Sequence, residues 1–289
     1  MKTIRLLTIG NSFSNNAVTF LERIADSVGE ARFEVARACL GGCSLEKHWN
    51  IAEHTGAHPE YKTYTYCPEP GGETRGANLQ DSLSLKEWDV VTLQQVSRKS
   101  WQRETFEPYL GNLMKLVRER APKADVRLHQ TWAYRVDSPY LPENNMTQRI
   151  MHDRIRANYE HFAKQYGCAI LPSGEAVQAA RETPGRTFTW PEADYDYQHP
   201  EAPALPKQEH SFAVGFQWAI NSAPEGIPEL RRDPNHLNAR GCYLAGAVWY
   251  ECLTGLDVTA TTFAPEGMAD DDAAFLRGVA HETTARAQC

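Results

Sequence analysis

Apolar and polar positions follow two alternating patterns along the chain. Short runs rich in apolar residues, typical of strands and nearly all apolar at 89–94, alternate with longer stretches in which apolar residues recur at helical spacing. The runs predict strands at residues 4–9, 32–38, 89–94, 125–129 and 168–171, and the helical spacing predicts helices at 17–29, 107–120, 144–166 and 238–253. Repeats of strand, helix and strand imply parallel pairing with right-handed crossovers, so we expect an α/β fold.

The helix predicted at 238–253 carries signals at both ends. Asn238 precedes it in the position where an amide side chain caps a helix, and Gly255 follows it as a stop. We expect this helix to close the chain.

Two stretches interrupt the alternation. Residues 54–82 and 183–232 are rich in Pro, Gly, Tyr and Trp, and loops of this length in a compact domain usually form functional walls or lids. The chain shows no repeats and no linker-like segment of low complexity. A length of 289 residues suits one large α/β domain, so we expect a single domain over 1–289 with insertions at about 54–82 and 183–232.

Composition and charge narrow the class of partner. Lys and Arg total 30 against 37 Asp and Glu, which gives a net charge of −7, and neither sign is gathered into a long block. Nucleic-acid binding normally needs a basic face, so we expect small or neutral substrates and no nucleic acid. No run approaches the ~18 apolar residues that a membrane span needs, so we expect no membrane partner.

The start of the chain and its cysteines indicate a compartment. The opening MKTIRLLTIG leads directly into the first predicted strand, without the pattern of a secretory signal. The seven cysteines are odd in number and irregularly spaced, which argues against a full disulfide framework. We expect a cytoplasmic protein, or a periplasmic or secreted one if a signal peptide has been removed. Cys39 and Cys43 are close in sequence, and their pairing stays open.

A polar turn follows the first predicted strand. The strand ends at Gly10, and the next residues are Asn11, Ser12 and Phe13. In open parallel sheets, ligands bind beyond the carboxyl ends of the strands. A serine at this turn either caps the following helix or serves as a nucleophile, and its position alone does not decide between the two.

A nucleophilic serine needs a base, and the base needs a third group that holds its tautomer. Among ten histidines, His236 stands out because it lies in RRDPNHLN just before the predicted last helix, three residues after Asp233. Pro234 restrains the backbone between them, which suits a carboxylate that orients an imidazole. The alternative is an ordinary Asp-Pro-Asn turn with a locally packed histidine.

The remaining motifs predict neither a metal site nor a phosphate site. The spacing of His48, His54 and His58 matches no metal motif, and the chain has no CxxC pair. The turn after the first strand has no GxGxxG pattern and no lysine after its glycine. We therefore expect no metal and no cofactor.

Taken together, GNSFS at the end of the first strand and DxxH before the last helix resemble the first and last signature blocks of the SGNH, or GDSL-like, hydrolase superfamily. The resemblance implies a three-layer α/β/α fold with a flavodoxin-like parallel sheet. It also implies Ser12 as nucleophile, His236 as base and Asp233 as the group that holds the base. Asn11 stands where Asp is commonest in the superfamily, a departure that leaves the nucleophile intact.

The superfamily's middle blocks supply an oxyanion hole, which acyl transfer needs because the tetrahedral intermediate carries negative charge. Gly41 and Gly42 match its glycine block, and Gly42 is expected to donate its N–H together with that of Ser12; a plain strand-to-helix turn would have the same sequence. The third block usually reads GxND, but here the chain reads VVTLQQVS. We expect the side-chain amide of Gln94, or else of Gln95, to take the place of the asparagine.

The resulting hypothesis is a serine esterase that hydrolyses a small acyl ester, preferably acetyl, on a carbohydrate. Aromatic residues in the insertions either form a wall on which a sugar ring stacks or are core and subunit contacts; they are Tyr61, Tyr64, Tyr66, Trp190, Tyr195, Tyr197 and Trp218. Two alternatives are an acyltransferase that uses the same triad and a carbohydrate-binding protein without catalysis.

Overall fold

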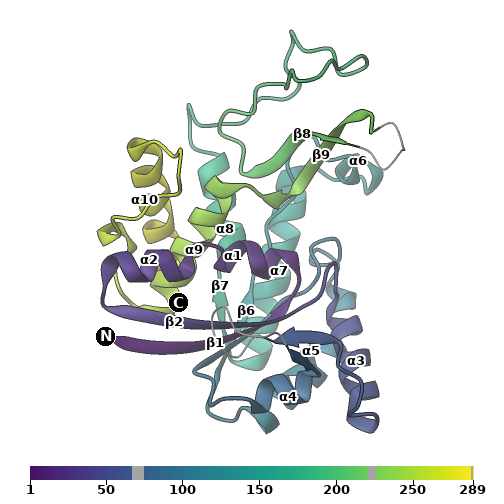
Figure 1. Ribbon diagram of the computed structural model, residues 1–289, viewed down its shortest axis with the longest axis vertical. Helices are drawn as coiled ribbons and strands as arrows, with labels where there is room; N and C mark the ends of the chain where they lie inside the picture. The colour runs from purple at the N-terminus through teal and green to yellow at the C-terminus, as the bar shows by residue number, and fades with distance from the viewer. Residues whose placement is uncertain (67–74, 221–225, 288) are drawn as a thin grey trace.

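A central parallel sheet organises the computed structural model of the chain, which describes residues 1–66, 75–220, 226–287 and 289 (Figure 1). Its five strands have the order β2-β1-β5-β6-β7, and each neighbouring pair is parallel. The strands are β1 (Lys2–Gly10), β2 (Ala31–Cys39), β5 (Val90–Leu93), β6 (Asp125–His129) and β7 (Ala169–Leu171). The predicted strands and the α/β class are confirmed, and the order is that of flavodoxin-like sheets.

Helices cover both faces of this sheet (Figure 1). In one layer α1, α2, α8 and α10 pack around α9; in the other α3, α4 and α5 pack together, with α7 beside the segment that leads into α5. The helices are α1 (Ser12–Val18), α2 (Leu21–Val28), α3 (Leu45–Ala57), α4 (Leu79–Ser84), α5 (Tyr109–Arg120), α6 (Tyr140–Glu143), α7 (Gln148–Tyr166), α8 (Ser173–Arg181), α9 (Ala239–Thr254) and α10 (Asp270–Ala287), with short 3₁₀ turns at Arg103–Thr105 and Val258–Ala260. The three predicted layers are therefore present.

The register of the sheet brings three strand ends to one edge. Gly10 of β1 lies opposite Cys39 of β2, and Ile9 lies opposite Leu93 of β5. Because the strands are parallel, the segments that follow them leave the sheet side by side. The turn at Asn11, the Gly-Gly loop after β2 and the glutamines after β5 are thus neighbours.

Helix α9 occupies the centre of its layer and is buried almost all round. The Asn238 side chain accepts from Gly241 N, and Gly255 adopts the left-handed conformation with φ +71, so both predicted end signals are confirmed. Buried apolar residues from Ile4 to Ala280 form one cluster on both sides of the sheet. Among the described residues, no helix is both long enough and apolar enough to cross a bilayer.

Helix α9 does not close the chain as expected, because α10 follows it. The buried face of α10 consists mainly of small or polar side chains, which gives a weak apolar period; its members are Ala273, Leu276, Ala280, Thr283 and Thr284. The end of the chain is tied back to α9 by a disulfide between Cys252 and Cys289, while Cys39 and Cys43 are free. Helix α8, also rich in alanine, was missed in the same way.

The region predicted as one helix at 17–29 is divided in two. Helix α1 already begins at Ser12 and ends at Val18, and α2 carries the predicted apolar face with Leu21 and Ile24 buried. The polar residues of GNSFSNN hid the first helix, because its burial comes from Phe13, Ser14 and Ala17 rather than from a regular apolar stripe.

The two insertions contain more regular structure than predicted. The first includes the end of α3, the start of α4 and, between them, β3 (Tyr64–Tyr66) paired with β4 (Arg75–Ala77); residues 67–74 lie outside the described part of the chain. The second ends in an antiparallel hairpin of β8 (Ala213–Ile220) and β9 (Pro228–Leu237), which rises beyond the sheet together with the long loop before it (Figure 1). Its period-2 pattern is weak because only part of the hairpin is buried.

Candidate active site

In the turn after β1, Asn11 and not Ser12 caps the helix that follows, and this leaves the Ser12 hydroxyl uncommitted. Asn11 has extended backbone angles, and its Oδ1 accepts from Phe13 N at 3.0 Å, so Asn11 is the N-cap of α1. Ser12 is the first residue of the helix. Its side chain is therefore available for another partner.

That partner is His236, which comes from a segment 224 residues further along the chain. Ser12 Oγ lies 2.8 Å from His236 Nε2, and His236 Nδ1 lies 2.7 Å from Asp233 Oδ2. When Nδ1–H donates to the carboxylate, Nε2 is left as the acceptor of the serine proton. The structure thus brings the three predicted side chains into one hydrogen-bonded chain.

The negative charge of Asp233 and the positive charge of protonated His236 stabilise each other. The pKa of His236 is raised above its ordinary value by its hydrogen bond to Asp233, against the lowering effect of partial burial. Partial burial alone would raise the pKa of Asp233, but hydrogen bonds from the His236 ring and from the backbone N–H groups of His236 and Asn235 lower it overall. Asp233 therefore stays ionised where the imidazole titrates.

Asp233 and His236 lie in the last part of β9, and not in an ordinary turn before α9. The register of the hairpin shifts between Ala213 and Gly215, which face Leu237 and Asp233. This irregularity lets Pro234 sit within a strand, because proline has no N–H to donate to a ladder. It also allows the Asp233 and His236 side chains to meet, which regular strand spacing would not.

Residues after β6 hold this segment in place and were missed at the sequence level. Trp132 Nε1 donates to Asn235 O at 2.8 Å, and Arg135 N donates to Pro234 O at 2.9 Å. The Trp132 ring stacks on Phe13 at 4.2 Å, next to Ser12. In the sequence, only their position could have indicated this role, since TWAYR comes soon after a strand, at the carboxyl edge of the sheet.

The glutamines after β5 direct their side-chain amides to protein acceptors, and their part in an oxyanion hole stays a prediction. Gln94 Nε2 donates to Asn11 Oδ1 at 2.9 Å and to Gln95 O at 3.0 Å, while its Oε1 accepts from Ser14 Oγ. Gln95 Nε2 donates to the carbonyl and the hydroxyl of Thr105. An amide nitrogen has two protons, and in both residues these are already used. Gln94 thus supports the cap residue Asn11.

Two backbone N–H groups remain available next to the serine hydroxyl. Among the described residues, neither Ser12 N nor Gly42 N donates to a protein acceptor. Gly42 has φ +60, a conformation that favours glycine, and its loop is tied to the turn because Asn11 Nδ2 donates to Cys43 O at 3.1 Å. These N–H groups have the chemistry that a developing oxyanion needs.

A cavity of about 470 Å³ opens at the serine. This volume is in the range of small-molecule sites. Its lining comes from the ends of β1, β2, β5 and β6 and from β9, and consists of Asn11, Ser12, Phe13, Gly42, Val96, Ser97, Arg98, Tyr134, Tyr140, Asn235 and His236.

Comparison with known proteins places the chain in a family. The family described as DUF4886, a domain of unknown function, matches residues 5–189, which is more than half of the chain. The chain belongs to this family. The matched segment includes Ser12 and Gly42 and ends before Asp233 and His236. No curated protein matches the chain.

Solved structures extend the comparison beyond the matched segment. A DUF4886 family protein from Bacteroides uniformis has a TM-score of 0.74 and 26% identity, over 98% of this chain and 95% of that one. A candidate SGNH hydrolase from Slackia heliotrinireducens has a TM-score of 0.51 and 18% identity, over 86% of this chain and 98% of that one. The second likeness shows that this DUF4886 chain shares the fold of proteins assigned to the SGNH hydrolases.

A buried histidine of the DUF4886 chain, His48, contacts the backbone where the serine turn begins. His48 Nε2 lies 2.9 Å from Gly10 O, and its Nδ1 lies 2.8 Å from the Tyr64 hydroxyl. Burial lowers the pKa of His48 to about 4, so the ring is neutral and donates from Nε2 to the carbonyl. His48 had no assigned role at the sequence level, and Tyr64 is its buried partner rather than an exposed sugar contact.

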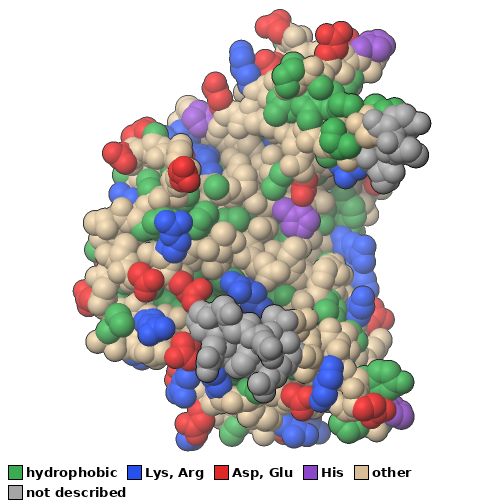
Figure 2. All heavy atoms as spheres, in the orientation of Figure 1, with side chains coloured by type: hydrophobic (Ala, Val, Ile, Leu, Met, Phe, Trp, Pro, Cys, Tyr) green, Lys and Arg blue, Asp and Glu red, His purple; other side chains and the backbone are tan. Residues whose placement is uncertain are grey.

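Most aromatic side chains of the second insertion contact one another. The Trp190 ring lies 4.7 Å from Tyr197 and 5.7 Å from Phe216, and Trp218 Nε1 donates to a backbone carbonyl at 2.8 Å. Hydrophobic side chains gather at this end of the molecule, over the β8–β9 hairpin (Figure 2). These rings form the small core of the insertion, which agrees with the core alternative. The Tyr66 side chain lies outside the described part of the chain.

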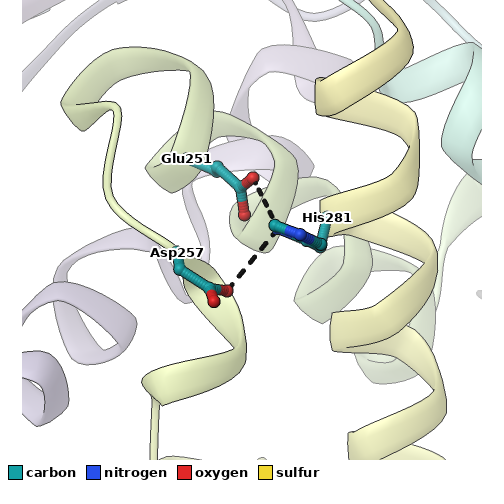
Figure 3. A group of neighbouring side chains, drawn as sticks. All are labelled: Glu251, Asp257 and His281. Carbon is teal, nitrogen blue, oxygen red and sulfur yellow. Dashed lines mark hydrogen bonds and ion pairs between the residues drawn. The ribbon is translucent and has the colours of Figure 1, made fainter.

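One side-chain group away from the serine has the composition of a metal site. Glu251, Asp257 and His281 place their donor atoms within 4.8 Å of one another (Figure 3). Their atoms are paired with each other, since His281 Nδ1 lies 2.9 Å from Glu251 Oε1 and 3.5 Å from Asp257 Oδ1. Glu251 Oε1 also accepts from Thr284 Oγ1 at 2.7 Å. The group thus connects α9, α10 and the loop between them.

Proposed function

We propose that this protein is a serine esterase of the SGNH type that hydrolyses a small acyl ester, preferably acetyl, on a carbohydrate. The observation that carries the proposal is the hydrogen-bonded chain from Ser12 Oγ through the His236 ring to Asp233, which opens into a cavity at the carboxyl edge of the sheet. The fold shared with a candidate SGNH hydrolase supports the same class.

The first half-reaction forms an acyl-enzyme. His236 Nε2 removes the proton from Ser12 Oγ as the oxygen attacks the ester carbonyl, and Asp233 stabilises the resulting imidazolium. The tetrahedral intermediate then collapses. The bond to the alcohol oxygen breaks, and the imidazolium donates its proton to the departing alcohol.

The second half-reaction repeats these proton transfers with water. His236 takes a proton from a water molecule as it attacks the acyl carbon, and the carboxylic acid leaves as Ser12 Oγ regains its proton. In both halves the negative charge on the former carbonyl oxygen is received by the N–H groups of Ser12 and Gly42. Asn11, held by Gln94 and Cys43 O, keeps these two donors together.

The proposal is tested by release of p-nitrophenol from p-nitrophenyl acetate. Ser12→Ala and His236→Ala are compared with the parent protein, and circular dichroism verifies that each variant is folded. Loss of a triad member typically costs several powers of ten in turnover, so both variants are expected near background. His161→Ala, at an exposed position of α7, is the matched control and is expected to keep the parent rate.

Two outcomes would contradict the assignment. If both triad variants hydrolyse the ester as fast as the parent, then Ser12 and His236 are structural and not catalytic residues. If the parent releases neither p-nitrophenol nor acetate from acetylated sugars, yet binds those sugars unchanged after Ser12→Ala, the protein binds carbohydrate without catalysis. Product analysis with competing sugar acceptors separates hydrolysis from acyl transfer.

A further inference from the structure

The cavity beside Ser12 contains one permanent positive charge, that of Arg98. No carboxylate belongs to the lining that the structure describes, so nothing in the cavity neutralises this charge. Within the described chain the Arg98 guanidinium forms no ion pair and no hydrogen bond, whereas its neighbour Lys99 pairs with Glu46 at 2.8 Å. An exposed cation without a protein partner thus belongs to the lining of the cavity at the reacting serine, in a chain of net charge −7.

The backbone at Arg98 is fixed even though its side chain is free. The Tyr140 hydroxyl donates to Arg98 O at 2.6 Å and accepts from Trp101 Nε1 at 3.0 Å. The next turn is closed by hydrogen bonds from Lys99 N and Ser100 N to Val96 O. The guanidinium therefore extends from a rigid base, which reduces the entropy lost when it binds a ligand.

Hydroxyl groups accompany the cation in the cavity. Ser97 Oγ and the Tyr134 hydroxyl are 2.8 Å apart and form a pair of groups that can both donate and accept. Such a lining suits a ligand with several hydroxyls and one negative charge. An exposed arginine elsewhere on the surface would be unremarkable, but this one shares a small cavity with the serine and the imidazole.

We propose that the substrate is an acyl ester of an acidic sugar, whose carboxylate is bound by Arg98 while Ser12 attacks the ester. This inference rests on the proposed esterase function and specifies its substrate class. The planar guanidinium matches the two oxygens of a carboxylate and balances its single charge. A phosphate dianion would call for more positive charge than the single arginine of this lining supplies.

The experiment compares mono-O-acetyl-D-galacturonate with its methyl ester at the carboxyl group, in which a methyl group replaces the negative charge. Acetate release gives kcat/KM for each. The parent is expected to prefer the acid by about tenfold or more, the effect of a charge-assisted hydrogen bond. Arg98→Gln should bring the ratio to about one, and Arg98→Lys should retain part of the preference. Arg120→Gln, at the exposed end of α5, is the matched control and should keep the parent ratio.

The outcomes separate this inference from the proposed function. Equal rates on the two substrates, a preference for the methyl ester, or a ratio that survives Arg98→Gln would overturn the role of Arg98 while esterase activity stands. If p-nitrophenyl acetate and both sugars are inert, the esterase proposal fails instead. Binding of D-galacturonate and of its methyl ester, followed by ligand-observed NMR, then decides: Arg98-dependent preference for the acid supports the carboxylate site, and its absence overturns it.

Discussion

At the residue scale, the protonation state of His236 controls the proposed reaction. The base must be neutral to accept the serine proton, so activity should fall as the pH drops below the pKa of the imidazole. Because the Asp233 carboxylate raises that pKa above the ordinary value, the acid limb of kcat/KM should lie above about pH 6.5. Partial burial reduces the shift without cancelling it.

Asp233→Asn should change the rate and the pH profile together. Loss of the carboxylate removes the group that raises the pKa of His236, so the acid limb of the remaining activity should move to lower pH. The rate should fall on the order of 10⁴-fold, because the amide also disturbs the imidazole tautomer. The measurement is kcat/KM for p-nitrophenyl acetate between pH 5 and 9. An unchanged acid limb would show that another group controls it.

At the element scale, Arg135 links the loop after β6 to the segment that leads into the β8–β9 hairpin, and it does so from a buried ion pair with Asp137. Arg135 and Asp137 have side chains 2% and 0% exposed, with a nitrogen to oxygen distance of 2.6 Å. Arg135 Nη1 also donates to Gln208 Oε1 and Ser211 Oγ, both at 3.0 Å, in the segment that leads into β8. The position of the hairpin therefore depends on this arginine.

Arg135→Met should destabilise the fold and reduce activity. It removes the hydrogen-bonded partner of the buried Asp137 carboxylate and leaves it with Arg232 at 3.9 Å and the attraction of the buried Arg181; breaking a buried pair costs about 3–5 kcal/mol. Thermal unfolding and p-nitrophenyl acetate turnover are the measurements. The double variant Arg135→Met with Asp137→Asn should recover part of the stability, because the carboxylate that lost its partner is no longer buried as a charge. A single variant as stable as the parent would contradict the anchoring role.

At the scale of the whole molecule, the buried apolar cluster joins the start and the end of the chain. It includes Ile4 of β1 and Ala280 of α10, and α9 lies between the two in the middle of its layer. The first insertion contributes Tyr64, Ala77 and Leu79 to this cluster, whereas the second contributes Phe212, just before β8. The cluster agrees with the single domain that we predict for residues 1–289.

A single domain should unfold in one cooperative transition. The calorimetric enthalpy of unfolding should then match the van't Hoff enthalpy, and fluorescence and circular dichroism should report the same midpoint. Differential scanning calorimetry of the full chain is the measurement. Two separated transitions would show that the second insertion or the α9–α10 region unfolds independently.

The sequence by itself determined the features that depend on neighbouring residues. The five strands were predictable because each is a short segment with apolar residues at buried positions, and α9 was predictable because Asn238 and Gly255 mark its ends. The polar turn after the first strand made Ser12 a candidate, the DPNH segment before the last helix made Asp233 and His236 candidates, and the resemblance to the SGNH hydrolases added Gly42. Helix α10 was not predictable, because its buried face is made of alanine and threonine around Leu276.

Only the tertiary structure decided which candidates meet. Sequence could not show that Ser12 and His236, 224 residues apart, lie 2.8 Å from each other, since that distance depends on a parallel sheet and an irregular hairpin. Nor could it show that Gln94 turns inward to Asn11 and Ser14, because the direction of a side chain is set by which buried polar groups need partners. Periodicity determines elements locally, whereas a site is a property of the packing that brings distant strand ends together.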